Sequence, residues 1–275
     1  MWYGAEEPLP AGGSCLLGSL NLSEFVIDGT FDFDGFREAV GIAVVALNDV
    51  LEEGLPLHPL AEQRKSVGDW RQIGLGIMGL ADMLIKLGLK YGSPESLDLC
   101  DTIGKVMANE ALITSSQIAS IKEPFKYCNM QEIAGTEFFA NHLEDYHDYH
   151  AVVEQGLRNS QLLTIAPTGT LSTMLGISGG IEPIFANSYT RKTESLHNED
   201  VYYKVYTPIV DKYMKDNGLT EEEQLPDYFV TAGTLNYIDR LNMQATWQKH
   251  IDASISSTVN VPENFTVEDT FDLYV

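Results

Sequence analysis

Residues 73–89, IGLGIMGLADMLIKLGL, constrain the fold more than any other stretch of this chain. The stretch has few polar residues, which predicts a helix inside the protein rather than on its surface. Its apolar residues recur at helical spacing: Ile73, Ile77, Leu80, Leu84 and Leu87. The letters also match the dinucleotide motif GxGxxG, but that motif needs an apolar strand before it, and SVGDWRQ precedes it here. We therefore interpret the three glycines as sites of close helix packing.

The remaining segments predict helices alternating with short apolar strands, which indicates an α/β fold in one unit spanning residues 1–275. Asp34 and Ser93 are placed to cap two of the helices, and Cys100 is interpreted as a core residue of the second. The expected helices cover residues 35–53, 93–122, 131–142, 200–216 and 241–250, with another starting at Thr266. The expected strands cover residues 162–166 and 251–261, and residues 181–189 are expected to be extended.

The net charge of the chain restricts the kinds of partner that the protein can bind. A formal net charge of -23 would repel a phosphate backbone, so we expect no nucleic-acid binding. One nucleotide is not excluded, because a single phosphate site needs only local donors. No apolar run approaches the length of a transmembrane span, and the start of the chain does not read as a signal peptide. Three cysteines do not suit a disulfide scaffold, so we expect a cytoplasmic protein.

The opening segment, MWYGAEEPLPAGGSC, predicts an irregular loop that delivers a thiol to a short buried strand. Prolines and glycines between positions 8 and 13 break any helix or strand. Glu6 and Glu7 lie in the same loop as Cys15, so a carboxylate and a thiol could line one cavity. General-base catalysis needs such a carboxylate near a substrate hydroxyl. From the residues alone, we favour the simpler interpretation, which is exposed acids and a plain buried cysteine.

A second candidate site follows the expected strand 162–166. The residues Pro167, Thr168, Gly169, Thr170 and Leu171 combine a strand end, hydroxyl groups and a glycine before an apolar segment. Unpaired backbone N–H groups at a helix start favour anions, and a glycine lets a phosphate approach the backbone. The same pattern also fits a simple N-cap turn. We call these residues the 167–171 loop.

Two further clusters have a chemical and a structural interpretation. The run HLEDYHDYH at 142–150 holds metal-type ligands, but its spacing matches no known site, so we expect a solvated loop and no metal. Glu182 lies in an apolar, glycine-rich setting where a carboxylate must be paired or functionally tuned. We favour a structural pair with Arg191 or Lys192.

Several of these stretches together resemble the catalytic barrel of the ribonucleotide reductase large subunit. They occur in family order and run from Ala5 to about Val275. The resemblance is closest to bacterial adenosylcobalamin-dependent forms, although iron- or manganese-dependent subunits share these motifs. The matching stretches are AEEPLPAGGSCLLGSLNLSEF, RQIGLGIMGLADMLIKLGLKYGS, LRNSQLLTIAPTGTLSTMLGISGGIEPIFANSYTRKT and MQATWQKHIDASISSTVNVP.

The resemblance implies a fold and a set of residue roles. The family fold is a ten-stranded α/β barrel of two five-stranded halves around a finger loop, and this chain would supply the finger's exit and most of the second half. The family replaces the ribose 2′-hydroxyl of a ribonucleotide with hydrogen through a cysteine thiyl radical. Glu6 falls on the catalytic base, Cys15 on one redox cysteine, Ser14 on a substrate contact and the 167–171 loop on the phosphate site. Adenosylcobalamin is the implied cofactor, although no motif in this chain binds it.

The sequence departs from the family where the radical forms. The family pattern is Asn-x-Cys-x-Glu, whereas this chain has Trp2, Gly4 and Glu6 at the three defined positions. Glycine has no sulfur, so no thiyl can form at position 4, and the family's C-terminal reducing cysteines are absent from this sequence as well. We therefore expect a barrel fragment that is inactive alone and needs a missing N-terminal half or a second subunit. The alternative is a catalytically inactive nucleotide-binding remnant that uses only the 167–171 loop.

Overall fold

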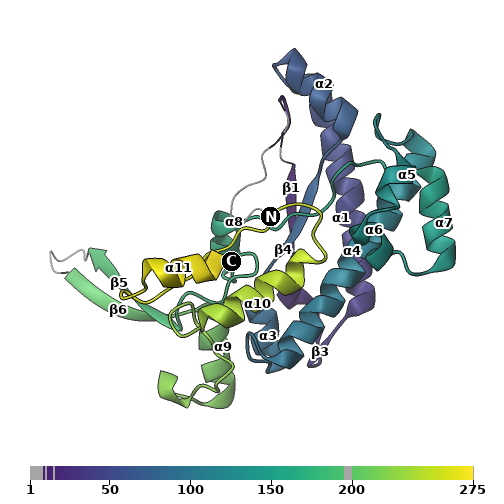
Figure 1. Cartoon of the computed structure of the whole chain (residues 1–275). Coiled ribbons are helices and arrows are strands. Elements are labelled where there is room, and N and C mark those ends of the chain that lie inside the picture. Colours follow the sequence, from purple (N-terminus) through teal and green to yellow (C-terminus); the bar gives the residue numbers. More distant parts are fainter. Residues whose placement is uncertain (1–8, 10, 15, 195–199, 275) are drawn as a thin grey trace.

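The computed structural model of the protein describes residues 9, 11–14, 16–194 and 200–274. Four roughly parallel segments form its centre. Strand β1 (Leu17–Asn21) pairs in parallel with β4 (Gly74–Met78). Parallel bridges then join Leu75 to Leu163 and Ile165 to Ile255. Helices surround these segments (Figure 1), which confirms the α/β class expected from the sequence.

The predicted helix over residues 73–89 is wrong in its first half, because β4 occupies that part. All five residues of β4 are buried, and a strand buried on both faces reads as a continuous apolar run. Close packing does explain the glycines: a Cβ placed at Gly76 would lie 2.3 Å from the Thr164 carbonyl oxygen. Gly79 adopts a φ of 71°, and helix α3 (Leu80–Leu87) begins only after it.

Two long helices cover one side of the strands. Helix α1 (Phe33–Gly54) packs against α4 (Pro94–Lys122), as Figure 1 shows. The cap of α1 is Asp32 rather than the expected Asp34, since its side chain accepts a hydrogen bond from the Gly35 N–H at 3.0 Å. Ser93 caps α4 as predicted, and Cys100 is fully buried within that helix.

A hairpin projects from the body of the protein (Figure 1). It consists of β5 (Ser188–Glu194) and β6 (Asp200–Tyr206), which pair antiparallel. The helix predicted over residues 200–216 is therefore wrong in its first part, where two valines and three tyrosines within seven residues favour a strand. Helix α9 (Pro208–Asn217) starts at Pro208 and is closed by Gly218, as its C-terminal signal indicates.

The other elements show smaller differences from the expectations. The segment 131–142 divides into two short helices, and residues 162–166 and 251–261 contribute only isolated bridges. Thr266 and Asp269 exchange the hydrogen bonds of the predicted cap before the last helix. The remaining helices are α2 (Ala61–Trp70), α5 (Met130–Ile133), α6 (Glu137–His142), α7 (Tyr146–Gln155), α8 (Gly169–Leu175), α10 (Tyr237–Gln248) and α11 (Val267–Tyr274). The short elements are β2 (Val26–Ile27), β3 (Thr30–Phe31), η1 (Leu22–Phe25), η2 (Leu55–Leu57) and η3 (Glu222–Gln224). Among the described residues, no helix combines the length and apolar character that a membrane crossing requires.

Candidate functional site

The 167–171 loop leaves the third parallel segment and turns directly into α8. Thr168 holds a left-handed conformation with a φ of 51° and ψ of 22°, and its carbonyl accepts the Ser172 N–H at 2.8 Å. The amides of Gly169, Thr170 and Leu171 form the first helical turn, where no intrahelical acceptor exists. A Cβ at Gly169 would meet nothing within 4 Å, so space is open beside this residue at the start of the helix.

A second glycine-rich segment supports the back of this loop. The Gly180 N–H donates a hydrogen bond to Thr168 Oγ1 at 3.0 Å. A Cβ at Gly179 would lie 2.7 Å from the Pro167 carbonyl oxygen, so only glycine fits there. The left-handed Thr168, an uncommon conformation for a β-branched residue, is thus held by its neighbours.

Helix α3 holds the glycine-rich segment behind the loop in place through a buried carboxylate, Asp82. The sequence alone does not identify this residue. Asp82 is 2% exposed and accepts the Ser178 N–H at 2.7 Å. Ser178 in turn accepts the Ala81 N–H through its hydroxyl at 3.2 Å. The only sequence signal was an aspartate within an apolar run, and its partner lies 96 residues later.

Glu182 is paired, but not with the residues named from the sequence. Its carboxylate accepts hydrogen bonds from Arg240 Nη2 at 2.9 Å and Nε at 3.3 Å, and from the Thr258 N–H at 3.0 Å. Arg191 and Lys192 instead lie in β5 of the projecting hairpin. Tyr91 donates to the adjacent Ile181 carbonyl at 2.6 Å, and burial holds the pKa of its hydroxyl far above the usual range. The pair therefore joins α10 to the segment behind the 167–171 loop.

The predicted catalytic residues are only partly described. Glu6 and Cys15, together with Gly4 and Glu7, lie outside the described residues. Ser14 precedes the amino end of β1, whereas Pro167 follows the carboxyl end of a neighbouring parallel segment. The described residues therefore place Ser14 and the 167–171 loop toward opposite ends of the parallel segments.

The histidine-rich run does not form a solvated loop throughout. His142 ends α6 and is buried, while Asp145 caps α7 by accepting the N–H groups of His147 and Asp148. These two hydrogen bonds hold the pKa of Asp145 below its usual range. Across the described ranges, no three His, Cys, Asp or Glu side chains gather as a metal site would require.

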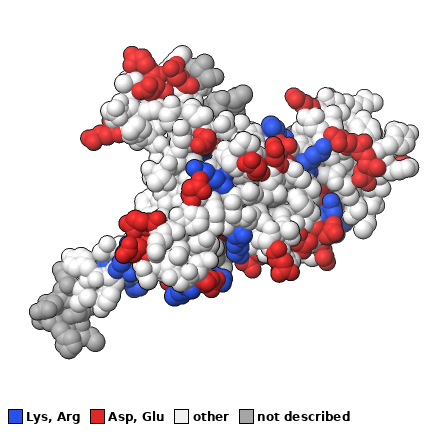
Figure 2. Space-filling model, turned by 90° about the horizontal axis from the view of Figure 1, so that it is seen from below, with Lys and Arg blue, Asp and Glu red and all other residues white. Residues whose placement is uncertain are grey.

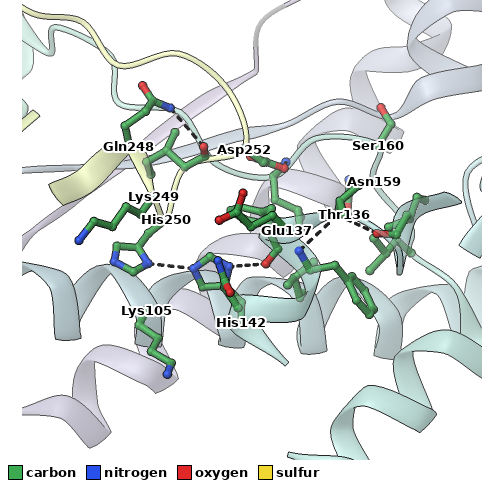
Figure 3. A pocket seen from close by; sticks show the side chains of 18 of the residues that line it. Lys105, Thr136, Glu137, His142, Asn159, Ser160, Gln248, Lys249, His250 and Asp252 are labelled. Carbon is green, nitrogen blue, oxygen red and sulfur yellow. Dashed lines mark hydrogen bonds between the residues drawn. The ribbon is translucent and has the colours of Figure 1, made fainter. Parts of the chain in front are cut away.

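His142 instead lines a cavity of about 900 Å³ between α4, α6 and the end of α10 (Figure 3). Its ring contacts His250, and Asp252 lies two residues further along the chain. The Asp252 carboxylate accepts the N–H groups of Leu162 at 2.9 Å and Leu163 at 2.6 Å. This aspartate thus fixes the start of the segment that ends in the 167–171 loop.

Comparison with known proteins agrees with the resemblance in the sequence. The family model of the ribonucleotide reductase barrel domain matches residues 5–275. Two relatives are named vitamin B12-dependent ribonucleoside-diphosphate reductase. The one from Mycobacterium tuberculosis (strain CDC 1551 / Oshkosh) is 31% identical over 98% of this chain and 38% of the relative. The one from Thermoplasma acidophilum is 33% identical over 96% of this chain and 34% of the relative.

A solved structure shares the fold. The Actinobacillus ureae class Id ribonucleotide reductase alpha subunit superposes with a TM-score of 0.70 at 21% identity, covering 94% of this chain and 46% of that one. This chain therefore spans little more than a third of the length of the two B12-dependent relatives. Because the family model matches residues 5–275, which is nearly the whole chain, the chain belongs to the ribonucleotide reductase family and corresponds to sequence of its barrel domain.

Proposed function

We propose that this chain is one part of a ribonucleotide reductase, acting as a single barrel unit over residues 1–275 and holding the substrate's phosphates at the 167–171 loop. The family match supports the reaction class, and the open first turn of α8 is the observation that supports the phosphate site. Three backbone N–H groups there have no intrahelical acceptor, and the helix dipole adds a favourable field for an anion.

The remaining roles follow the resemblance. We propose that Ser14 contacts a part of the substrate distant from its phosphates, since Ser14 and the 167–171 loop lie toward opposite ends of the parallel segments. We also propose that Glu6 accepts the proton of the 3′-hydroxyl while a cysteine radical on another part of the enzyme takes the 3′-hydrogen. Cys15 and a second cysteine then supply two electrons and two protons and become a disulfide, and the 2′-hydroxyl leaves as water. The radical cysteine finally returns the hydrogen atom to C3′ and Glu6 returns the proton to the 3′-oxygen, so both groups are regenerated. As the resemblance implies, we propose that the second cysteine lies in the missing N-terminal half of the barrel.

The cofactor of the B12-dependent relatives needs a separate test of fit. The functional statement that the relatives offer is their printed dependence on vitamin B12. No motif among the described residues indicates an adenosylcobalamin site, so we propose that this cofactor binds to another part of the enzyme.

The surface agrees with a small anionic substrate rather than a nucleic acid. Figure 2 shows acidic side chains spread over one face, with lysines and arginines interspersed among them, and the whole chain carries a net charge of -23. Such a surface repels a polyanion, while a local cradle of amides still accepts one phosphate group. We propose a cytoplasmic enzyme whose partner is the other half of the barrel or a second subunit.

Because Gly4 replaces the radical cysteine, the chain by itself is expected to produce no deoxyribonucleotide. The measurement is conversion of a ribonucleoside di- or triphosphate to its deoxy form, with and without a separately produced N-terminal half and a radical generator. Turnover by the chain alone would overturn this expectation. Turnover restored by the added half supports a split enzyme, whereas nucleotide binding without turnover supports the inactive remnant.

Replacement of Gly169 by aspartate is expected to weaken pyrophosphate binding about tenfold or more without unfolding the chain. An acidic residue in the first turn suits the helix dipole, and the Cβ position is open. A carboxylate at this point repels a bound anion by roughly 3 kcal/mol at 5 Å near a protein surface. Titration calorimetry with pyrophosphate measures the change. Gly169→Asn is the matched control without charge, and equal affinities of the two variants would reject the phosphate site.

A further inference from the structure

Two buried histidines from distant parts of the chain face each other in the cavity between α4, α6 and the end of α10 (Figure 3). His142 Nε2 lies 2.8 Å from His250 Nδ1. His142 Nδ1 lies 2.6 Å from the Phe138 carbonyl oxygen, and His250 Nε2 lies 3.2 Å from Asp101 Oδ1. His142 is 2% exposed and His250 is 6% exposed, so water does not replace these contacts.

The acceptors at both ends fix how many protons the two rings can hold. A carbonyl oxygen only accepts, so His142 Nδ1 carries a proton. Only one proton fits between the two nitrogens that face each other at 2.8 Å. With a third proton on His250 Nε2, the pair carries one positive charge. A fourth proton would set two N–H groups against each other and break the contact.

The charged groups around the rings come from all three packed elements. Helix α4 contributes Asp101 and Lys105, Glu144 follows α6 and pairs with Lys105 at 2.9 Å, and Lys249 follows α10 and pairs with Asp101 at 3.0 Å. Burial lowers the pKa of both histidines, and the charges of nearby lysines act in the same direction. Burial alone would raise the pKa of Asp101, but hydrogen bonds from Lys249 and His250 outweigh it and lower that pKa.

Glu137 of α6 and Asp252 also line the cavity, and neither is within the three hydrogen bonds of the histidine pair. The acids in the lining therefore favour binding of the first added proton by the histidine pair. They do not relieve the repulsion between the two N–H groups that a second added proton would bring face to face.

We propose that the contact between His142 and His250 is an acid-sensitive clasp, which holds α6 against the end of α10 while the two rings share at most one added proton. A second proton separates the rings and opens this side of the cavity. The consequence is a proton deficit in the folded chain, because two unfolded histidines each bind a proton near their ordinary pKa of about 6.5.

The sign of the effect follows from that deficit. Below the ordinary histidine pKa the unfolded chain binds more protons than the folded chain, so stability falls as the pH falls. One proton of difference changes the folding equilibrium constant tenfold for each pH unit.

The test compares the pH dependence of unfolding in three forms of the full chain. Between pH 6 and pH 5, the folding equilibrium constant of the wild type is expected to fall about tenfold more than that of His142→Gln. In this variant His250 can take its proton without conflict. His150→Gln, which removes an exposed histidine of α7, should keep the wild-type slope. Equal slopes of the wild type and His142→Gln would overturn the proposal.

Nitrogen NMR of the imidazole rings gives a second measurement that does not depend on a folded variant. In the wild type, His142 and His250 are expected to gain one proton together while the native spectrum persists. The second proton is expected to appear only with loss of the native signals of α6. Native chains with both rings doubly protonated would refute the clasp whatever the variants do.

Discussion

Replacement of Arg240 by methionine is expected to lower the free energy of unfolding by about 3 kcal/mol. The side chain of Arg240 is 3% exposed, and it donates two hydrogen bonds to Glu182, whose side chain is 28% exposed. Removing one partner of a buried pair leaves the other charge without compensation, which typically costs 3–5 kcal/mol. We expect the lower end because water reaches part of Glu182. Urea denaturation followed by circular dichroism measures the change.

An exposed ion pair in the same chain provides the control. Lys90 and Asp227 lie 3.2 Å apart, with side chains 53% and 80% exposed. Lys90→Met also replaces a cation by methionine, yet it should cost less than about 1 kcal/mol because solvent screens such pairs. If Arg240→Met proved as mild as Lys90→Met, the Glu182 pair would not hold α10 to the segment behind the 167–171 loop.

The second large effect is expected for Gly76→Ala, which should destabilise the fold by about 3 kcal/mol. The new Cβ would lie 2.3 Å from the Thr164 carbonyl oxygen and 3.2 Å from the Ile165 Cα. Both obstacles are backbone atoms, so no side-chain rotation relieves the clash, and β4 must move away from the segment that leads into the 167–171 loop. Overpacking of a core commonly costs 1–3 kcal/mol, and a backbone clash belongs at the upper end.

Gly54→Ala makes the same chemical change where nothing lies within 4 Å of the added carbon. Gly54 is the last residue of α1, with helical dihedral angles, so alanine should leave stability unchanged or raise it by up to about 1 kcal/mol. Thermal unfolding of both variants checks the pair. Similar melting temperatures would show that β4 and the neighbouring segment can accommodate a Cβ at Gly76.

Short-range sequence patterns predict several helix caps and helix ends correctly. The Ser93 cap, the closure of α9 by Gly218 and the reciprocal bonds of Thr266 and Asp269 all involve residues a few positions apart. The run 73–89 misled because apolar spacing cannot separate a strand buried on both faces from a buried helix. Its glycines were interpreted correctly as packing sites, although the packed element is a strand.

Partners distant along the chain were beyond prediction. The apolar setting of Glu182 predicts a carboxylate with a cationic partner, and Arg191 and Lys192 are its candidates because distance along the sequence is the only guide. The fold supplies Arg240, 58 residues later. The histidine-rich run predicts a solvated loop, whereas His142 is buried and contacts His250, 108 residues away. The sequence thus indicates that Glu182 needs a partner, but it indicates neither which residue supplies it nor that His142 has a buried neighbour.

The conformation of the 167–171 loop is fixed by residues that lie outside the loop. Gly179 and Gly180 press on its back, Asp82 anchors them through Ser178, and Asp252 holds the segment before it. A peptide with the sequence APTGTLS, or the same letters grafted onto a foreign scaffold, would lack all of these supports. The motif is therefore not a portable module, and finding it in another protein says little unless the distant supports accompany it.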